Sequence, residues 1–68
     1  MQQYKDEKHD RLYLVWSKKC KDGSTSYRVH YRENGHMRVR KESLWYGKEE
    51  DAQADLDYLA KTNGWKEY

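Results

Sequence analysis

The sequence predicts an α+β fold in which a three-stranded antiparallel sheet (a β-meander) is followed by one helix packed on one face, β-β-β-α. The first observation is a regular alternation of apolar and polar side chains, which is the pattern of half-buried strands. It runs, on both sides of Asn34-Gly35, through residues 26–42. In residues 11–18, Leu12, Leu14 and Trp16 alternate with Tyr13, Val15 and Ser17, which indicates a further strand. The second observation is a change to the helical period after Gly47, which places an apolar stripe along residues 48–62.

The first predicted turn is at Asp22-Gly23, a dipeptide typical of two-residue β-hairpin loops. A two-residue loop sets Trp16 opposite Val29 and Leu14 opposite Tyr31. Apolar side chains then meet across the two strands, so the turn and the alternation agree.

The second turn contains Asn34-Gly35, which also favours a two-residue loop. That register would set Tyr31 opposite Arg38 and mix apolar and basic side chains, because a one-residue slip moves every side chain to the other face. A three-residue loop over residues 33–35, with a bulge at the glycine, sets Tyr31 opposite Met37 instead. We therefore predict the bulged loop.

The predicted helix has signals at both ends. Acidic residues occupy positions 49–51, in the first turn, where the helix dipole favours negative charge, and Gly47 is a candidate N-cap. Asn63-Gly64 ends the helix, and Trp65 is placed to fold back on its last turn.

Because the helix can cover only one face, these registers divide the strand side chains. Those expected beneath the helix are Leu12, Leu14, Trp16, Tyr27, Val29, Tyr31, Met37 and Val39, joined by Leu44 or Trp45. Those expected on the open face are Tyr13, Val15, Ser17, Lys19, Arg28, His30, Arg32, His36, Arg38 and Arg40. The open face then holds basic residues and no carboxylate, and like charges on neighbouring strands repel each other.

The chain has 68 residues, enough for one domain, with 38% charged and 35% apolar residues, a composition near that of disordered proteins. Its seven Tyr and three Trp argue for a folded protein, since each ring can bury about 150–250 Å². We expect a single domain over residues 11–68 with a thin aromatic core. Residues 1–10 are polar, and we expect them to form a flexible N-terminal tail.

No run of eight apolar residues occurs, which excludes a membrane-spanning helix and a signal peptide, and the single Cys20 cannot form an internal disulfide. We expect a cytoplasmic protein without membrane contact. No pair of His or Cys has the spacing of a zinc site, and no catalytic arrangement of Ser, His or Cys is evident, so we expect no enzyme, no cofactor and no metal. A weak surface metal site at His30 and His36, diagonal neighbours in the predicted register, is the one alternative.

Charge is unevenly distributed along the chain: residues 1–41 hold eleven Lys or Arg and five Asp or Glu, and residues 42–68 hold three and seven. A basic sheet face suits nucleic acid, because arginine binds phosphates and guanine edges and a narrow sheet can approach a groove. We predict a small nucleic-acid-binding module, with double-stranded DNA favoured over RNA. The predicted contact residues are Tyr13, Lys19, Arg28, His30, Arg32, His36, Arg38 and Arg40.

Two other interpretations stay open. The protein could dock on another protein, for example as an inhibitor of a host protein, through the basic sheet or through the acidic helix, because Tyr, Trp and Arg are also enriched at protein interfaces. The basic face could also be only the solvated side of the sheet. Salt dependence separates the first from nucleic-acid binding, because phosphate contacts weaken steeply with salt.

The segment WYGKEEDAQADLDYLA, preceded by strands with alternating arginines, resembles the β3α layout of AP2-type DNA-binding domains and of the arm-site-binding N-terminal domains of phage and transposon integrases. In those families the sheet lies in the major groove. By position, the resemblance implies DNA contacts from Arg28, Arg32, Arg38 and Arg40, with Trp16 or Tyr13 beside them.

The chain departs from these families because it lacks the glycine-rich start of plant AP2 domains and an attached recombinase domain. The resemblance therefore implies an accessory or regulatory factor of a phage or mobile element. The same pattern overlaps with part of a double-stranded RNA-binding domain, but that fold needs an N-terminal helix, and MQQYKDEKHD is too polar to form an amphipathic one.

Overall fold

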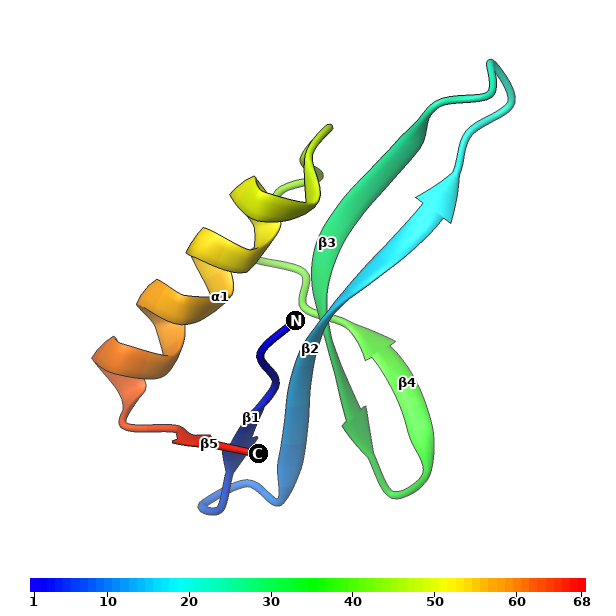
Figure 1. Ribbon diagram of the computed structural model, residues 1–68. Coiled ribbons are helices and arrows are strands. Elements are labelled where there is room, and N and C mark those ends of the chain that lie inside the picture. Colours follow the sequence, from blue (N-terminus) through cyan, green and yellow to red (C-terminus); the bar gives the residue numbers. More distant parts are fainter.

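A computed structural model describes residues 1–68 as an antiparallel sheet with one helix packed on one face (Figure 1). The elements in chain order are β1 Tyr4–Asp6, β2 Arg11–Lys19, β3 Thr25–Glu33, β4 His36–Val39, α1 Glu49–Asn63 and β5 Lys66–Glu67. The five strands lie in the order β4-β3-β2-β1-β5. The predicted α+β class, with a meander followed by a C-terminal helix, is confirmed, and the sheet has two strands more than predicted.

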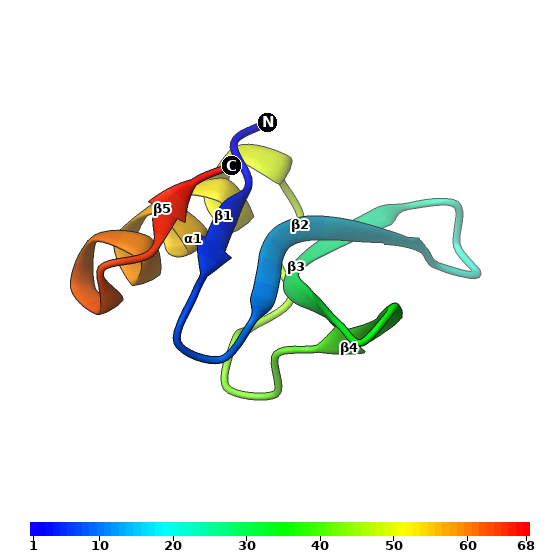
Figure 2. The same ribbon diagram turned by 90° about the horizontal axis from the view of Figure 1, so that it is seen from below.

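The two additional strands, β1 and β5, lie beside each other at one edge of the sheet. β1 falls within the residues expected to form a tail, and Tyr4 pairs with Tyr13 of β2. β5 follows the helix and pairs Glu67 with Tyr4, and the Tyr68 amide donates to the Gln3 carbonyl at 3.0 Å. The two termini therefore lie side by side (Figures 1 and 2). Strands of three and two residues are too short to show a period of two in the sequence.

The first hairpin differs by one residue from the predicted register. Val15 pairs with Val29, so Trp16 lies opposite Arg28 and not opposite Val29. The loop has three residues between Cys20 and Ser24, whose amide and carbonyl are bonded at 2.8 Å. The three-residue length of this loop has a local cause. The Asp22 carboxylate accepts a hydrogen bond from the Ser24 amide at 3.0 Å, and only Gly23, with φ 91°, is left-handed. A two-residue turn of type I′ would need a left-handed Asp22 as well.

The second turn also differs from the prediction, in the opposite sense. His30 pairs with Val39 and Tyr31 with Arg38, so the loop has two residues and no bulge. Asn34 and Gly35 both have positive φ, 53° and 78°, as a type I′ turn requires.

Both hairpins differ from the predicted register by one residue, and a shift of one residue moves every side chain of a strand to the other face of the sheet. The residues of β3 face as predicted, with Val29 toward α1 and Arg28 away from it. The residues of β2 and β4 face the opposite way. Tyr13 and Val15 lie beneath α1, while Leu12, Leu14, Trp16, Met37 and Val39 lie on the face away from it.

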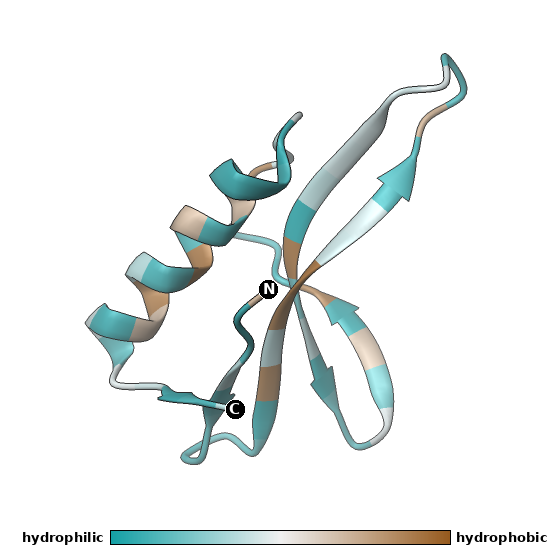
Figure 3. Cartoon of the chain, viewed as in Figure 1, coloured by the Kyte–Doolittle hydropathy of each residue, from teal (hydrophilic) through white to brown (hydrophobic).

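The core lies between α1 and the centres of β2 and β3, where Figure 3 shows the most hydrophobic part of both strands. Its buried residues are Tyr13, Val15, Val29, Ala52 and Leu56, with Ala60 buried farther along the helix. Tyr13 stacks on Trp65 with ring centroids 3.8 Å apart and an interplanar angle of 11°.

The helix begins and ends one residue later than predicted. Lys48, not Gly47, is the N-cap, and its side chain makes no capping hydrogen bond. The predicted C-cap is confirmed: Gly64 is left-handed with φ 73°, and the Trp65 amide donates to the Ala60 carbonyl at 2.9 Å. The Trp65 ring lies on Tyr13 of the sheet and so connects the end of the helix to β2.

Candidate nucleic-acid interface

We call the side of the sheet away from α1 the open face and the other side the helix-side face. Paired residues of antiparallel strands point to the same side, so the registers define both sets. The strand residues of the open face are Lys5, Leu12, Leu14, Trp16, Lys18, Ser26, Arg28, His30, Arg32, Met37, Val39 and Lys66. The open face is therefore a mixture of cations and apolar groups, and not the purely basic surface that was predicted.

Acidic and basic strand residues are sorted between the two faces. The strands contain three carboxylates, and Asp6, Glu33 and Glu67 all lie on the helix-side face. The open face carries no strand carboxylate and five cations, which are Lys5, Lys18, Arg28, Arg32 and Lys66.

Two of these five cations are neutralised by carboxylates of the turns. Lys5 pairs with Asp10 at 2.7 Å and Lys66 with Glu7 at 3.0 Å. The remaining three, Lys18, Arg28 and Arg32, form no ion pair. The open face thus has three positive charges without an acidic partner.

Trp45, from the segment between β4 and α1, lies over one part of the open face. The Arg28 guanidinium is 5.4 Å from the centre of the Trp45 ring and the Lys18 ammonium 6.0 Å, both within reach of a cation–π contact. Trp45 also meets the His30 ring edge-on at 6.1 Å. Trp45 is 42% exposed and Trp16 is 48% exposed, so both indoles remain accessible beside the cations.

Arg28 and His30 are more constrained than the sequence suggested. Arg28 donates from Nη2 to the Lys41 carbonyl at 2.9 Å, and its buried Nε has no protein partner. His30 is 6% exposed, with Nδ1 3.0 Å from the Arg28 carbonyl. Arg32, by contrast, is exposed, and its side chain makes no hydrogen bond with the rest of the chain. Of the predicted contact residues, Arg32 is the one most available from this face.

The other predicted contact residues lie on the helix-side face, so the prediction of one shared surface is wrong. They are Tyr13, Lys19, His36 and Arg38, and Arg40 lies on the same side just after β4. Tyr13 is 5% exposed beneath Trp65 and cannot be reached from the open face. His30 and His36 lie on opposite faces, which removes the surface metal site considered above.

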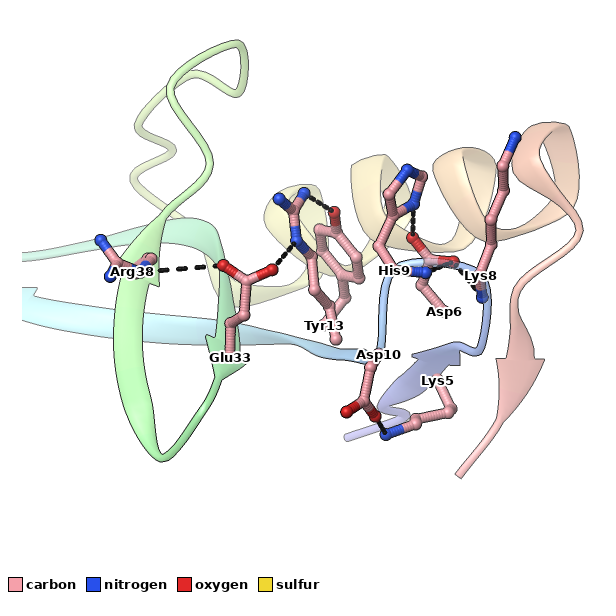
Figure 4. Close-up of polar contacts among 9 residues, drawn as sticks. Lys5, Asp6, Lys8, His9, Asp10, Tyr13, Glu33 and Arg38 are labelled. Carbon is pink, nitrogen blue, oxygen red and sulfur yellow. Dashed lines mark hydrogen bonds and ion pairs between the residues drawn. The ribbon is translucent and has the colours of Figure 1, made fainter.

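Arg38 belongs to a short network with Glu33 and Arg11 (Figure 4). The Glu33 carboxylate accepts from Arg11 Nε at 2.7 Å and lies 3.9 Å from Arg38. The Arg11 guanidinium donates to the Tyr13 hydroxyl at 3.3 Å and stacks over Tyr31 at 4.5 Å. The hydrogen bond to Glu33, and then that to Tyr13, raises the pKa of Arg11. On the helix-side face, this network connects the start of β2, the end of β3 and the strand β4.

The turn between β1 and β2 is organised by the buried Asp6 (Figure 4). Its carboxylate accepts from the amides of Lys8 and His9 at 3.1 and 3.3 Å and lies 2.8 Å from His9 Nδ1. Burial acts to raise the pKa of Asp6, but the hydrogen bonds from His9 and the amides outweigh burial and hold the pKa below its ordinary value.

No three His, Cys, Asp or Glu side chains come together in a group that could hold a metal ion. The one helix is neither long enough nor apolar enough to cross a membrane.

The predicted registers did not place Trp16, Lys18 or Trp45 on the open face, although the family resemblance names Trp16 as a possible DNA contact. The first two follow from the register of the first hairpin, and the Asp22-Gly23-Ser24 sequence, in which Asp22 caps Ser24, was the available signal. The expectation that Leu44 or Trp45 joins the core beneath the helix is wrong: both are exposed, and Trp45 lies beside Lys18 and Arg28 of the open face. Trp45 lies outside any strand, so no alternation of side chains indicates the side from which it approaches the sheet.

Comparison of the chain with family models, curated proteins and solved structures finds no match.

Proposed function

We propose that the protein is a small nucleic-acid-binding module and that its open face contacts double-stranded DNA. The observation that carries this proposal is the sorting of charge. Lys18, Arg28 and Arg32 have no acidic partner, while every strand carboxylate lies on the other side of the sheet. A polyanion relieves the repulsion among these cations and gains counterion release on binding.

The shape of the hairpin supports a groove ligand. β2 and β3 extend beyond α1 as a two-stranded ribbon (Figure 2). The major groove of B-DNA, about 12 Å wide, admits a ribbon of this kind. Trp16, Lys18 and Arg28 lie on the open side of the ribbon, where arginine can bind a phosphate or a guanine edge and the indole can pack on a sugar or a base.

The resemblance to AP2-type and integrase N-terminal domains supports the same ligand, because those families also place a sheet face in the major groove. With the observed registers it carries over to Arg28 and Arg32 only, since Arg38 and Arg40 lie on the helix-side face. The role it suggests is that of an accessory or regulatory factor of a phage or mobile element.

The test is a binding titration by fluorescence anisotropy with a mixed-sequence duplex and the corresponding single strand, repeated over a salt series. Three unpaired cations predict a slope of log K against log salt of about −2.7 on the duplex, from about −0.9 for each phosphate neutralised. Arg32→Gln is expected to weaken binding and to make the slope less steep by about one unit. Arg38→Gln, which removes an exposed arginine of the helix-side face, is the matched control and should leave both unchanged.

Absence of duplex binding at low salt would overturn the proposal. So would equal losses from Arg32→Gln and Arg38→Gln, because binding would then follow total charge and not the open face. Tighter binding to the single strand would transfer the proposal to single-stranded nucleic acid, in which bases stack on exposed aromatic rings.

A second candidate, docking on another protein, is favoured by the apolar groups of the open face. Trp16 and Trp45 are 48% and 42% exposed, and Leu12, Leu14, Met37 and Val39 are half-buried strand residues of the same face. Such groups are typical of interface cores. This candidate predicts a weak dependence on salt and a large loss of partner binding in Trp16→Ala, whereas duplex binding depends mainly on the cations.

A further inference from the structure

A hollow on the helix-side face is the second feature that could bind a ligand. The turn after β1, the strands β2 and β3, the end of α1 and the segment after β4 border an open hollow of about 550 Å³. This volume lies within the usual range of small-molecule sites, about 300–1,000 Å³. Tyr13, Tyr31 and Trp65 supply its aromatic surface, and the Tyr13–Trp65 stack fixes the position of the indole.

The rim of the hollow is mainly cationic. Four Lys or Arg side chains line it, namely Lys8, Arg11, Arg40 and Lys41, and of these only Arg11 is paired with a carboxylate, that of Glu33. Only two carboxylates line it, Asp6 and Glu42. One carboxylate oxygen of Asp6 accepts hydrogen bonds from the amides of its own turn and the other lies beside His9 Nδ1, so the Asp6 carboxylate is already bonded within that turn (Figure 4). Polar, positively charged walls of this kind favour an anionic ligand.

Two guanidinium groups are held in place with donors to spare. Arg11 is fixed by Glu33, by the Tyr13 hydroxyl and by stacking on Tyr31, which use its Nε and Nη1 and leave Nη2 without a partner. Arg40 donates from Nη1 to Ser43 at 2.9 Å, and its Nε and Nη2 have no partner. A guanidinium that is already oriented binds a phosphate at a lower entropic cost, and the fork of N–H groups matches phosphate oxygens.

We propose that this hollow binds a small molecule that carries both a phosphate and an aromatic ring, the class of nucleoside monophosphates. The phosphate meets Arg40 and Lys41 with the free donor of Arg11, and the ring packs against Trp65. The site lies across the sheet from the open face, so it does not depend on DNA binding.

The experiment is an amide and side-chain NMR titration with adenosine monophosphate, inorganic phosphate and adenosine as separate probes, each up to about 10 mM, a range that covers Kd values weaker than 1 mM. Adenosine monophosphate is expected to shift the Trp65 indole N–H and the Arg40 Nε–H. Phosphate alone should shift the arginine signal, and adenosine should shift neither at the same concentration. Arg40→Gln should weaken binding of the monophosphate at least about tenfold, the loss expected for one charge-assisted hydrogen bond.

Arg32→Gln is the matched control, because it removes the same group from the open face. It should leave binding of the monophosphate unchanged. Since Arg40 also bonds to Ser43, Lys41→Gln serves as a second variant that leaves that bond intact and should also weaken binding. Absence of shifts at Trp65 and Arg40, shifts on the open face instead, or full binding in both Arg40→Gln and Lys41→Gln would overturn the proposal.

Discussion

Replacing valine by threonine at three strand positions tests which sheet face lies beneath α1. The two side chains have nearly the same shape, so the substitution changes little except the burial of one hydroxyl. Val15 is 5% exposed on the helix-side face, whereas Val39 is half-buried on the open face. The register predicted from the sequence placed these two residues the other way round. Val29, 0% exposed, lies beneath the helix in both arrangements and is the positive control.

The expected cost follows from the surroundings of each hydroxyl. At Val15 the neighbours are apolar or aromatic residues of the core cluster, and a buried hydroxyl without a partner costs about 1–3 kcal/mol. At Val39 the hydroxyl can reach water, and we expect less than about 1 kcal/mol. A chain of 68 residues has a free energy of unfolding of about 3–10 kcal/mol, from about 0.05–0.15 kcal/mol per residue. A loss of about 2 kcal/mol therefore lowers Tm by about 8–16 °C.

The stabilities of the three variants are compared by thermal and urea unfolding, monitored by circular dichroism. We expect Val15→Thr and Val29→Thr to be similarly destabilised and Val39→Thr to unfold close to the parent protein. The reverse order, with Val39→Thr as damaging as Val29→Thr and Val15→Thr harmless, would refute the observed registers. The proposed DNA interface would fail with them, because the open face would then carry different residues.

Three further predictions concern single groups. Asp57→Asn should lower the pKa of Tyr4, which the hydrogen bond to the Asp57 carboxylate raises to about 12, and an unchanged phenolate titration by absorbance would contradict this bond. Because that pKa is raised in the folded protein, the stability that Tyr4 contributes is present below its unfolded pKa and is lost as pH rises through the folded value. Asp6→Asn should cost about 1 kcal/mol at neutral pH. Since the pKa of Asp6 is lowered by folding, this difference in Tm should disappear as the pH falls through that pKa, and a constant difference down to acid pH would count against the role of the charge. Gly64→Ala forces a left-handed alanine at φ 73° and should lower the free energy of unfolding in urea by about 1–2 kcal/mol, whereas no loss would mean that the helix ends elsewhere.

The candidate site could be predicted only in part. The alternation in β3 correctly placed Arg28, His30 and Arg32 on the face away from the helix. The sequence predicts an open face whose charged strand residues are all positive. It does not predict which residues of β2 and β4 lie on that face, because this depends on the length of the turn on one side of each strand. For this reason the open face carries Trp16 and Lys18 of β2 instead of the predicted Tyr13 and Lys19.

The sequence by itself determined the α+β class, the presence of β2, β3 and β4, the helix to within one residue at each end, and the left-handed glycine that ends it. These features depend on local periodicity and on the conformations open to particular residues, which a sequence displays directly. Only the tertiary structure decided which face of the sheet is buried. Both faces of β2 are apolar, with Leu12, Leu14 and Trp16 on one and Tyr13 and Val15 on the other, so a period of two does not choose between them. The choice comes from contacts between residues far apart in the chain, above all the stacking of Trp65 on Tyr13 beneath the helix.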